Sequence, residues 1–116
     1  MKRNPPICYN SLTNINISKS ITSIGDGAFY YCINLTKVTI PDSVTVITPH
    51  AFEDCENLTN VIIGKGVTSK MDYAFCCCPS LTTIKHRGTE SQWERITEGV
   101  ILFDNEIEII FNYKGD

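Results

Sequence analysis

The sequence predicts an α/β repeat: a solenoid of stacked coils with parallel strands and short helical turns, closed by a C-terminal helix and strand. Three observations support this prediction. A nine-residue pattern recurs with a constant 23-residue period, each copy is followed by an alternation typical of strands, and the residues from Arg87 onward abandon the pattern. We therefore divide the chain into a lead-in (1–11), a repeat array (12–86) and a C-terminal cap (87–116).

The composition is that of one folded domain. The chain has 116 residues, of which 42% are hydrophobic and 20% are charged. A net charge of −3 provides no basic surface for phosphates, so we expect no nucleic-acid partner. The apolar runs are far shorter than the roughly 20 residues of a membrane-spanning helix, so we expect no membrane insertion.

The repeated pattern is A-F-x-x-C-x-[NS]-L-T, and its copies begin at Ala28, Ala51 and Ala74. Leu12 falls one period before Leu35 and opens a partial unit, so the array contains one partial and three full units. Because the period is constant, equivalent residues of successive coils should lie above one another.

Each leucine introduces a strand with one buried face. Apolar, mostly β-branched residues stand three and five positions after it, which is the alternation of a half-buried strand. The inward residues are Ile15, Val38, Val61 and Ile84, then Ile17, Ile40 and Ile63.

A second extended piece should follow each strand, at residues 21–24, 44–47 and 67–70. The next segment, containing Ala and Phe, should form one helical turn whose Phe enters the interior. We thus expect a stack of Phe29, Phe52 and Phe75. Lys70 breaks the pattern, so Met71 should turn inward there and make that corner irregular.

The last coil of a solenoid needs a cover. Residues 89–92 (T-E-S-Q) read as a capping box, which predicts a helix of about two turns with Trp93 and Ile96 on its inner side and Val100 near it. Gly99 should end that helix. A closing strand over 107–111 should place Ile107, Ile109 and Phe111 on one side.

The N-terminal residues 1–11 show no comparable cover. An open apolar end favours association, so a homodimer through this end is a secondary hypothesis. The basic start is followed by polar residues rather than an apolar stretch, so it is not a signal peptide. The protein either stays in the cell or is a piece of a longer exported chain.

Residues 40–59, which read I-P-D-S-V-T-V-I through A-F, C and L-T, resemble the repeat of the BspA-like leucine-rich-repeat family. The resemblance covers about residues 12–96. It implies a leucine-rich-repeat solenoid, often at a microbial or protist cell surface, that acts in adhesion and protein recognition without catalytic residues. The segment G-T-x-x-Q-W-x-x-I also resembles the end of such arrays, which implies a true C-terminal end.

The cysteines do not suggest chemistry. Cys32, Cys55 and Cys78 recur within the pattern, so we expect buried free thiols, and Cys8 should be an exposed one. The run of Cys76, Cys77 and Cys78 lacks the C-x-x-C spacing of a zinc site, and no calcium motif is present. His50 and His86 have no partner at the spacing of a triad and are read as surface or corner residues. We therefore expect no enzyme, metal or cofactor, and a redox role would depend wholly on the cysteines.

The outward residues of the strands are the candidate binding surface, because they vary where the inward ones repeat. Residues on a solvent-exposed surface without a ligand would also vary from coil to coil, so the binding role of this face is a hypothesis. With Ile62 as the one apolar anchor, the face would bind a protein or a glycan. The alternative is a structural spacer, or a fragment of a longer surface solenoid without its own ligand. The candidate residues are Asn14, Lys37, Thr39, Asn60, Ile62, Thr83 and Lys85.

Overall fold

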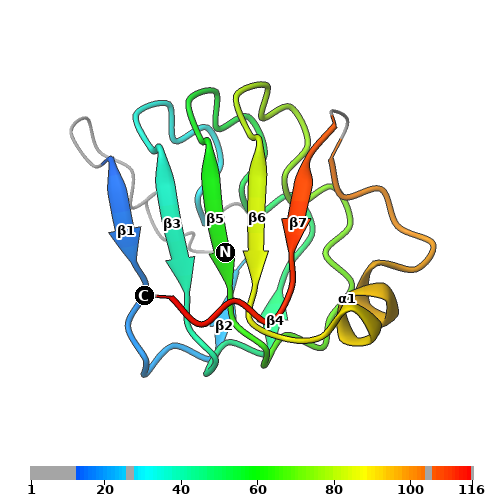
Figure 1. Ribbon diagram of the computed structural model, residues 1–116. Helices are drawn as coiled ribbons and strands as arrows, with labels where there is room; N and C mark the ends of the chain where they lie inside the picture. Colours follow the sequence, from blue (N-terminus) through cyan, green and yellow to red (C-terminus); the bar gives the residue numbers. More distant parts are fainter. Residues whose placement is uncertain (1–12, 26–27, 104–105, 116) are drawn as a thin grey trace.

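The computed structural model describes residues 13–25, 28–103 and 106–115. Successive coils stack side by side and their first strands form a parallel sheet in the order β1-β3-β5-β6-β7 (Figure 1). The strands are β1 (Asn14–Asn16), β3 (Lys37–Ile40), β5 (Asn60–Ile63), β6 (Thr83–His86) and β7 (Glu108–Ile110). This is the parallel-stranded solenoid that the 23-residue period predicts.

The strand register follows the sequence repeat. Ile15 pairs with Val38, Val38 with Val61 and Val61 with Ile84, so each step along the sheet is one repeat period. Val38, Val61 and Ile84 are fully buried, so the predicted inward column is confirmed. Strand β7 continues the sheet, with Ile109 beside Ile84, although it lies outside the repeat.

The second extended pieces form a smaller sheet only in the first two coils. There, β2 (Ser23–Ile24) pairs in parallel with β4 (Val46–Ile47). Lys70 interrupts the third coil, where Met71 is fully buried instead, and no strand forms over 67–70. The expectation of an irregular corner is confirmed.

The Ala-Phe segments form successive tight turns, so the expectation of a helical turn was wrong. Their local bonds run from a backbone N–H to the carbonyl three residues earlier, as from Ala51 to Thr48 and from Glu53 to His50. His50 and Asp54 have φ of 66° and Tyr73 and Cys77 have φ of 59° and 64°, so left-handed residues interrupt the helix in both coils.

The aromatic stack is confirmed. The ring centroids of Phe29 and Phe52 are 4.8 Å apart with the planes 4° from parallel, and those of Phe52 and Phe75 are 5.2 Å apart. All three side chains are buried. Their spacing matches that of neighbouring strands, about 4.8 Å, so one continuous interior runs through the coils.

The cap is built as predicted around α1 (Glu90–Thr97). The Thr89 hydroxyl accepts from the Gln92 N–H and the Gln92 side chain accepts from the Thr89 N–H, which is a complete capping box. Trp93 and Ile96 are buried. The helix ends before Gly99, whose φ is 76°. Ile107, Ile109 and Phe111 all pack against the core.

Candidate functional site

The seven candidate residues lie on one face of the five-stranded sheet, here called the outer face. Asn14, Lys37, Asn60 and Thr83 stand side by side in a first column. Thr39, Ile62 and Lys85 stand side by side in a second column. Neighbouring strands thus bring together side chains that are one repeat apart in the sequence.

Ile62 does not serve as an exposed anchor, and this expectation was wrong. The side chain is only 1% exposed, although it does not belong to the core cluster. It stands on a central strand between Thr39 and Lys85, and side chains in register on adjacent strands contact one another. The surrounding residues Lys37, Thr39, Asn60, Thr83 and Lys85 are half-buried, whereas Asn14 is exposed.

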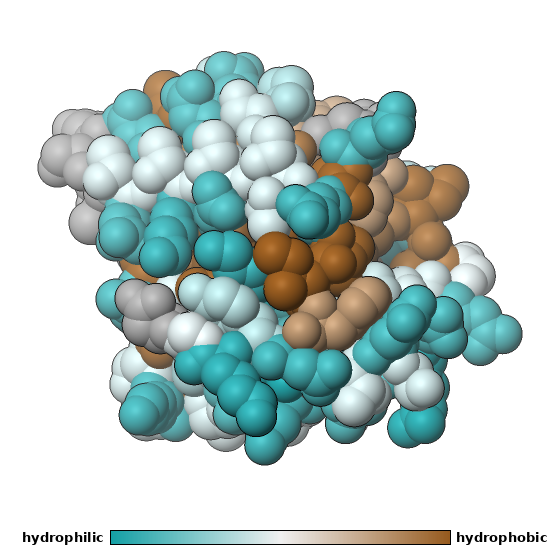
Figure 2. Space-filling view, in the orientation of Figure 1, coloured by the Kyte–Doolittle hydropathy of each residue, from teal (hydrophilic) through white to brown (hydrophobic). Residues whose placement is uncertain are grey.

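Strand β7 extends both columns beyond the repeat. Glu108 stands beside Thr83 and Ile110 beside Lys85. Figure 2 shows hydrophilic and neutral side chains over most of this face and apolar side chains gathered toward the β7 side. In the second column Ile62 is buried and Ile110 is half-buried, so Ile110 is the apolar residue of that column that reaches solvent. Sequence reasoning missed it because the pairing of β7 with β6 cannot be read from the repeat.

The C-terminal segment 112–115 crosses the end of the sheet (Figure 1). The backbone N–H of Tyr113 donates to the His86 carbonyl and that of Asn112 to the Gly88 carbonyl. The Tyr113 ring lies 5.0 Å from the Lys85 ammonium, so Lys85 is engaged by the chain's own tail. The Arg87 guanidinium donates to the Gly115 carbonyl, beside a hollow also lined by Asn16, Thr39 and Asp42.

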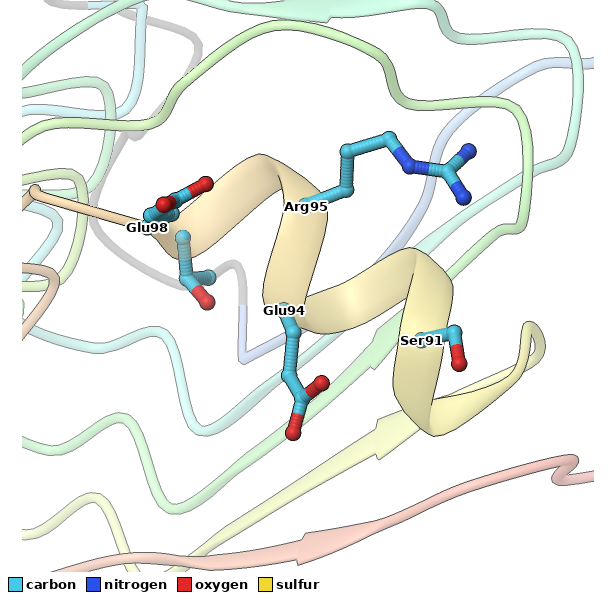
Figure 3. Close-up of a pocket in the computed structure, with 5 residues that line it drawn as sticks. Ser91, Glu94, Arg95 and Glu98 are labelled. Atoms are coloured by element: carbon cyan, nitrogen blue, oxygen red, sulfur yellow. The ribbon is translucent and has the colours of Figure 1, made fainter.

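A second hollow lies on the exposed side of α1, lined by Ser91, Glu94, Arg95, Thr97 and Glu98. Figure 3 shows Glu94 and Arg95 pointing away from each other. The side chains do not converge on a common point, which a specific small-molecule site requires.

Two repeat cysteines fit their predicted role. Cys55 and Cys78 are buried thiols that donate to the Phe29 and Phe52 carbonyls at 3.1 and 3.2 Å. The hydrogen bond with the Cys55 thiol, together with burial, raises the pKa of Cys78. Cys32 is also buried but is disulfide-bonded, so the expectation of a free thiol was wrong there. The expectation for Cys8 lies outside the described residues.

The two histidines differ. His50 is an exposed corner residue whose Nδ1 lies 2.7 Å from a Glu53 carboxylate oxygen. His86 is only 1% exposed, so reading it as a surface or corner residue was wrong. It replaces the inward Ile63 of the preceding strand and packs against Trp93, with ring centroids 5.1 Å apart. Burial lowers the pKa of His86.

One group of potential metal ligands occurs among the described residues. Ligand atoms of Glu53, Cys76 and Cys77 all lie within 4.8 Å of one another. The described part of the chain contains no helix with the length and apolar character that crossing a membrane requires.

Comparison with known proteins agrees with the repeat. Residues 7–111 match the BspA type leucine-rich-repeat region in six copies. A comparison with curated proteins finds no match. Among solved structures, the chain is similar to a leucine-rich cell surface protein from Faecalibacterium prausnitzii, with 20% sequence identity and a TM-score of 0.48. That similarity covers 90% of this chain and 33% of the other. From the match over residues 7–111, the chain belongs to the BspA-type leucine-rich-repeat family.

Proposed function

We propose that the protein is a non-enzymatic recognition module that binds a protein partner through the outer face of its sheet. The observation that carries this proposal is the contrast within each strand. Inward residues repeat from coil to coil, whereas outward neighbours in register differ in chemistry: Asn14, Lys37, Asn60, Thr83 and Glu108 form one mixed column. Family membership supports the same role, because solenoid sheets offer extended binding surfaces.

The apolar contact of this surface is Ile110 rather than the buried Ile62. Apolar residues at the centre of an interface supply much of its affinity, and a polar rim supplies specificity. Ile110 has Lys85 as its strand neighbour and Thr83 and Glu108 close by. A protein partner that offers a protruding apolar side chain to Ile110 and carboxylates to Lys37 and Lys85 fits this face better than a glycan does.

The test is affinity for a partner captured from surface-protein extracts on the immobilised chain. Substituting Lys37, Asn60 and Ile110 with alanine should weaken binding at least tenfold and leave the circular dichroism spectrum unchanged. Exposed Thr45 and Thr68, on another side of the coils, supply a control double-alanine variant that should bind normally. Equal binding by both variants would refute the outer face as the site, and failure to retain any partner would favour the spacer role.

Two further proposals concern location and assembly. We infer a place at the cell surface from family membership, and surface biotinylation of cells expressing the parent protein tests it.

We also infer a homodimer through the β1 end, where Ile15, Ile17, Ile21 and Phe29 line an apolar hollow. Ile21 is 39% exposed, so Ile21→Lys should convert a dimer to a monomer in light scattering. A wild-type chain that is monomeric at high concentration would exclude the dimer.

A further inference from the structure

We propose that Glu53, Cys76 and Cys77 form a site for a thiophilic divalent cation such as Zn²⁺, held between the second and third full repeat units. Two thiolates and one carboxylate would bind the ion, and water would complete its coordination. The site lies on the turns of the Ala-Phe segments, apart from the outer face of the sheet.

The two sulfur atoms are spaced as a metal requires. The Sγ atoms of Cys76 and Cys77 are 3.6 Å apart. Two thiolates bound to one tetrahedral Zn²⁺ at about 2.3 Å each would be about 3.8 Å apart. The thiols are in the reduced form, with Cys76 half-buried and Cys77 exposed, so an ion can reach both.

The backbone explains why adjacent cysteines converge here. Successive side chains of a helix do not face each other. Cys77 has a left-handed φ of 64°. Tyr31 and Asp54 stand at the equivalent positions of the other units and also have a left-handed φ, so this turn is a regular feature of each coil. It sets the two thiols side by side, a geometry that the sequence alone does not reveal.

The third ligand comes from the preceding coil. Glu53 precedes Cys76 by one repeat period and therefore stands beside it in the stack. Its carboxylate lies within 4.8 Å of both thiols. An ion bound here would link two coils, which would stabilise the stack against separation.

A histidine supports that carboxylate. The His50 Nδ1 is 2.7 Å from a Glu53 oxygen, and the His50 ring stacks on Tyr73 with centroids 5.4 Å apart. Metal-binding carboxylates and histidines commonly have such a second hydrogen-bonded partner, which fixes the ligand's orientation. His50 is thus a positioning residue.

The local charge also favours a cation. Asp54 directly follows Glu53, and its backbone N–H donates to the Cys76 carbonyl, so a second acidic residue lies beside the cluster. Soft sulfur ligands select Zn²⁺ or Cd²⁺ over Mg²⁺ or Ca²⁺.

The test uses the metal-free full chain, with Cys76 and Cys77 as thiols and the Cys32 disulfide intact, and Cd²⁺, whose bonds to thiolates give an ultraviolet charge-transfer band. We expect one Cd²⁺ per chain and displacement by Zn²⁺ but not by Mg²⁺. Cys76→Ser and Cys77→Ser should each remove about half of the band and raise Kd at least tenfold. Glu53→Gln should raise Kd about tenfold while leaving the band per bound ion unchanged, because it supplies oxygen. His50→Asn should also raise Kd about tenfold, which lies in the range for a residue that hydrogen-bonds a metal ligand and fixes its orientation.

Glu56→Gln is the matched control, because Glu56 is an exposed acid three residues after Glu53, and it should bind as the wild type does. The Cys76→Ser/Cys77→Ser variant retains the other four of the six cysteines, and undiminished Cd²⁺ binding by it would overturn the proposal. A second measurement needs no variant: Zn²⁺ should protect Cys76 and Cys77 from alkylation in the native chain. Equal alkylation with and without Zn²⁺ would also overturn it.

Discussion

Phe52 is the central ring of the interior stack, with Phe29 on one side and Phe75 on the other. The side chain is fully buried. Phe52→Ala should lower the free energy of unfolding by about 3–5 kcal/mol, since it removes apolar contacts and leaves a cavity. Denaturant titration measures this change. The control is the exposed Tyr30, which follows Phe29 in the sequence. Tyr30→Ala should lower the free energy of unfolding by less than about 1 kcal/mol. Similar losses in both variants would contradict the stacked interior.

His86 makes the stability depend on pH. Burial lowers its pKa in the folded chain below the ordinary 6.5, so the unfolded chain binds the proton more readily. The stability that neutral His86 contributes to the folded chain is fully present above about pH 6.5. It is lost as the pH falls from there toward the folded-state pKa of His86.

Its Nδ1 has no hydrogen-bond partner among the described residues, which leaves neutral imidazole the favoured form. The melting temperature of the wild type should therefore fall between about pH 7 and pH 5. His86→Ile, which restores the inward residue of the preceding strand, should flatten that decline. His50→Asn is the control and should keep it. An unchanged pH profile for His86→Ile would show that other groups cause the decline.

The corner after β5 depends on glycine because consecutive coils touch there through their backbones. A Cβ on Gly66 would lie 2.0 Å from the Asp42 carbonyl oxygen, whereas a Cβ on Gly25 would have no atom of the described residues within 4 Å. Gly66→Ala should thus destabilise the fold by about 1–3 kcal/mol. Gly25→Ala should be neutral or stabilise it by about 0.4–1 kcal/mol, by restricting the unfolded chain. Chemical denaturation compares the two, and equal effects would contradict the close approach of the coils.

The elements that follow the 23-residue period were the most predictable. The inward column from Ile15 to Ile84 and the phenylalanine stack each follow from a spacing that every coil repeats. The Ala-Phe turns were not predicted, because left-handed residues such as His50 and Cys77 carry no glycine or asparagine signal. The same turn geometry explains why the cluster of Glu53, Cys76 and Cys77 was missed.

The candidate site was predictable in its register but not in its exposure. Alternation along a strand shows that Ile62 faces away from the core, but whether neighbouring side chains shield it depends on the whole surface. Contacts that cross the molecule, such as Tyr113 over Lys85 and Ile110 beside it, join the repeat to residues outside it. No periodicity specifies such contacts.

The cap keeps the open end of the stack from water. The Tyr73 and Phe75 N–H groups donate to the Ile101 and Leu102 carbonyls, so the cap supplies the hydrogen bonds that a further coil would make. Trp93 and Ile96 also pack against the core. Removing residues 88–116 should therefore expose the last coil, lower the melting temperature and cause aggregation, since solenoids need a polar end.

Circular dichroism melts and size-exclusion chromatography measure both effects. The matched control removes only residues 112–116, which takes away the tail but retains α1 and β7. It should remain folded and should leave Lys85 free of the Tyr113 ring, with a small loss of stability because cation–π contacts contribute about 0.5–1 kcal/mol at exposed sites. A monomeric chain without residues 88–116 that melts like the control would show that the coils are stable without their cap.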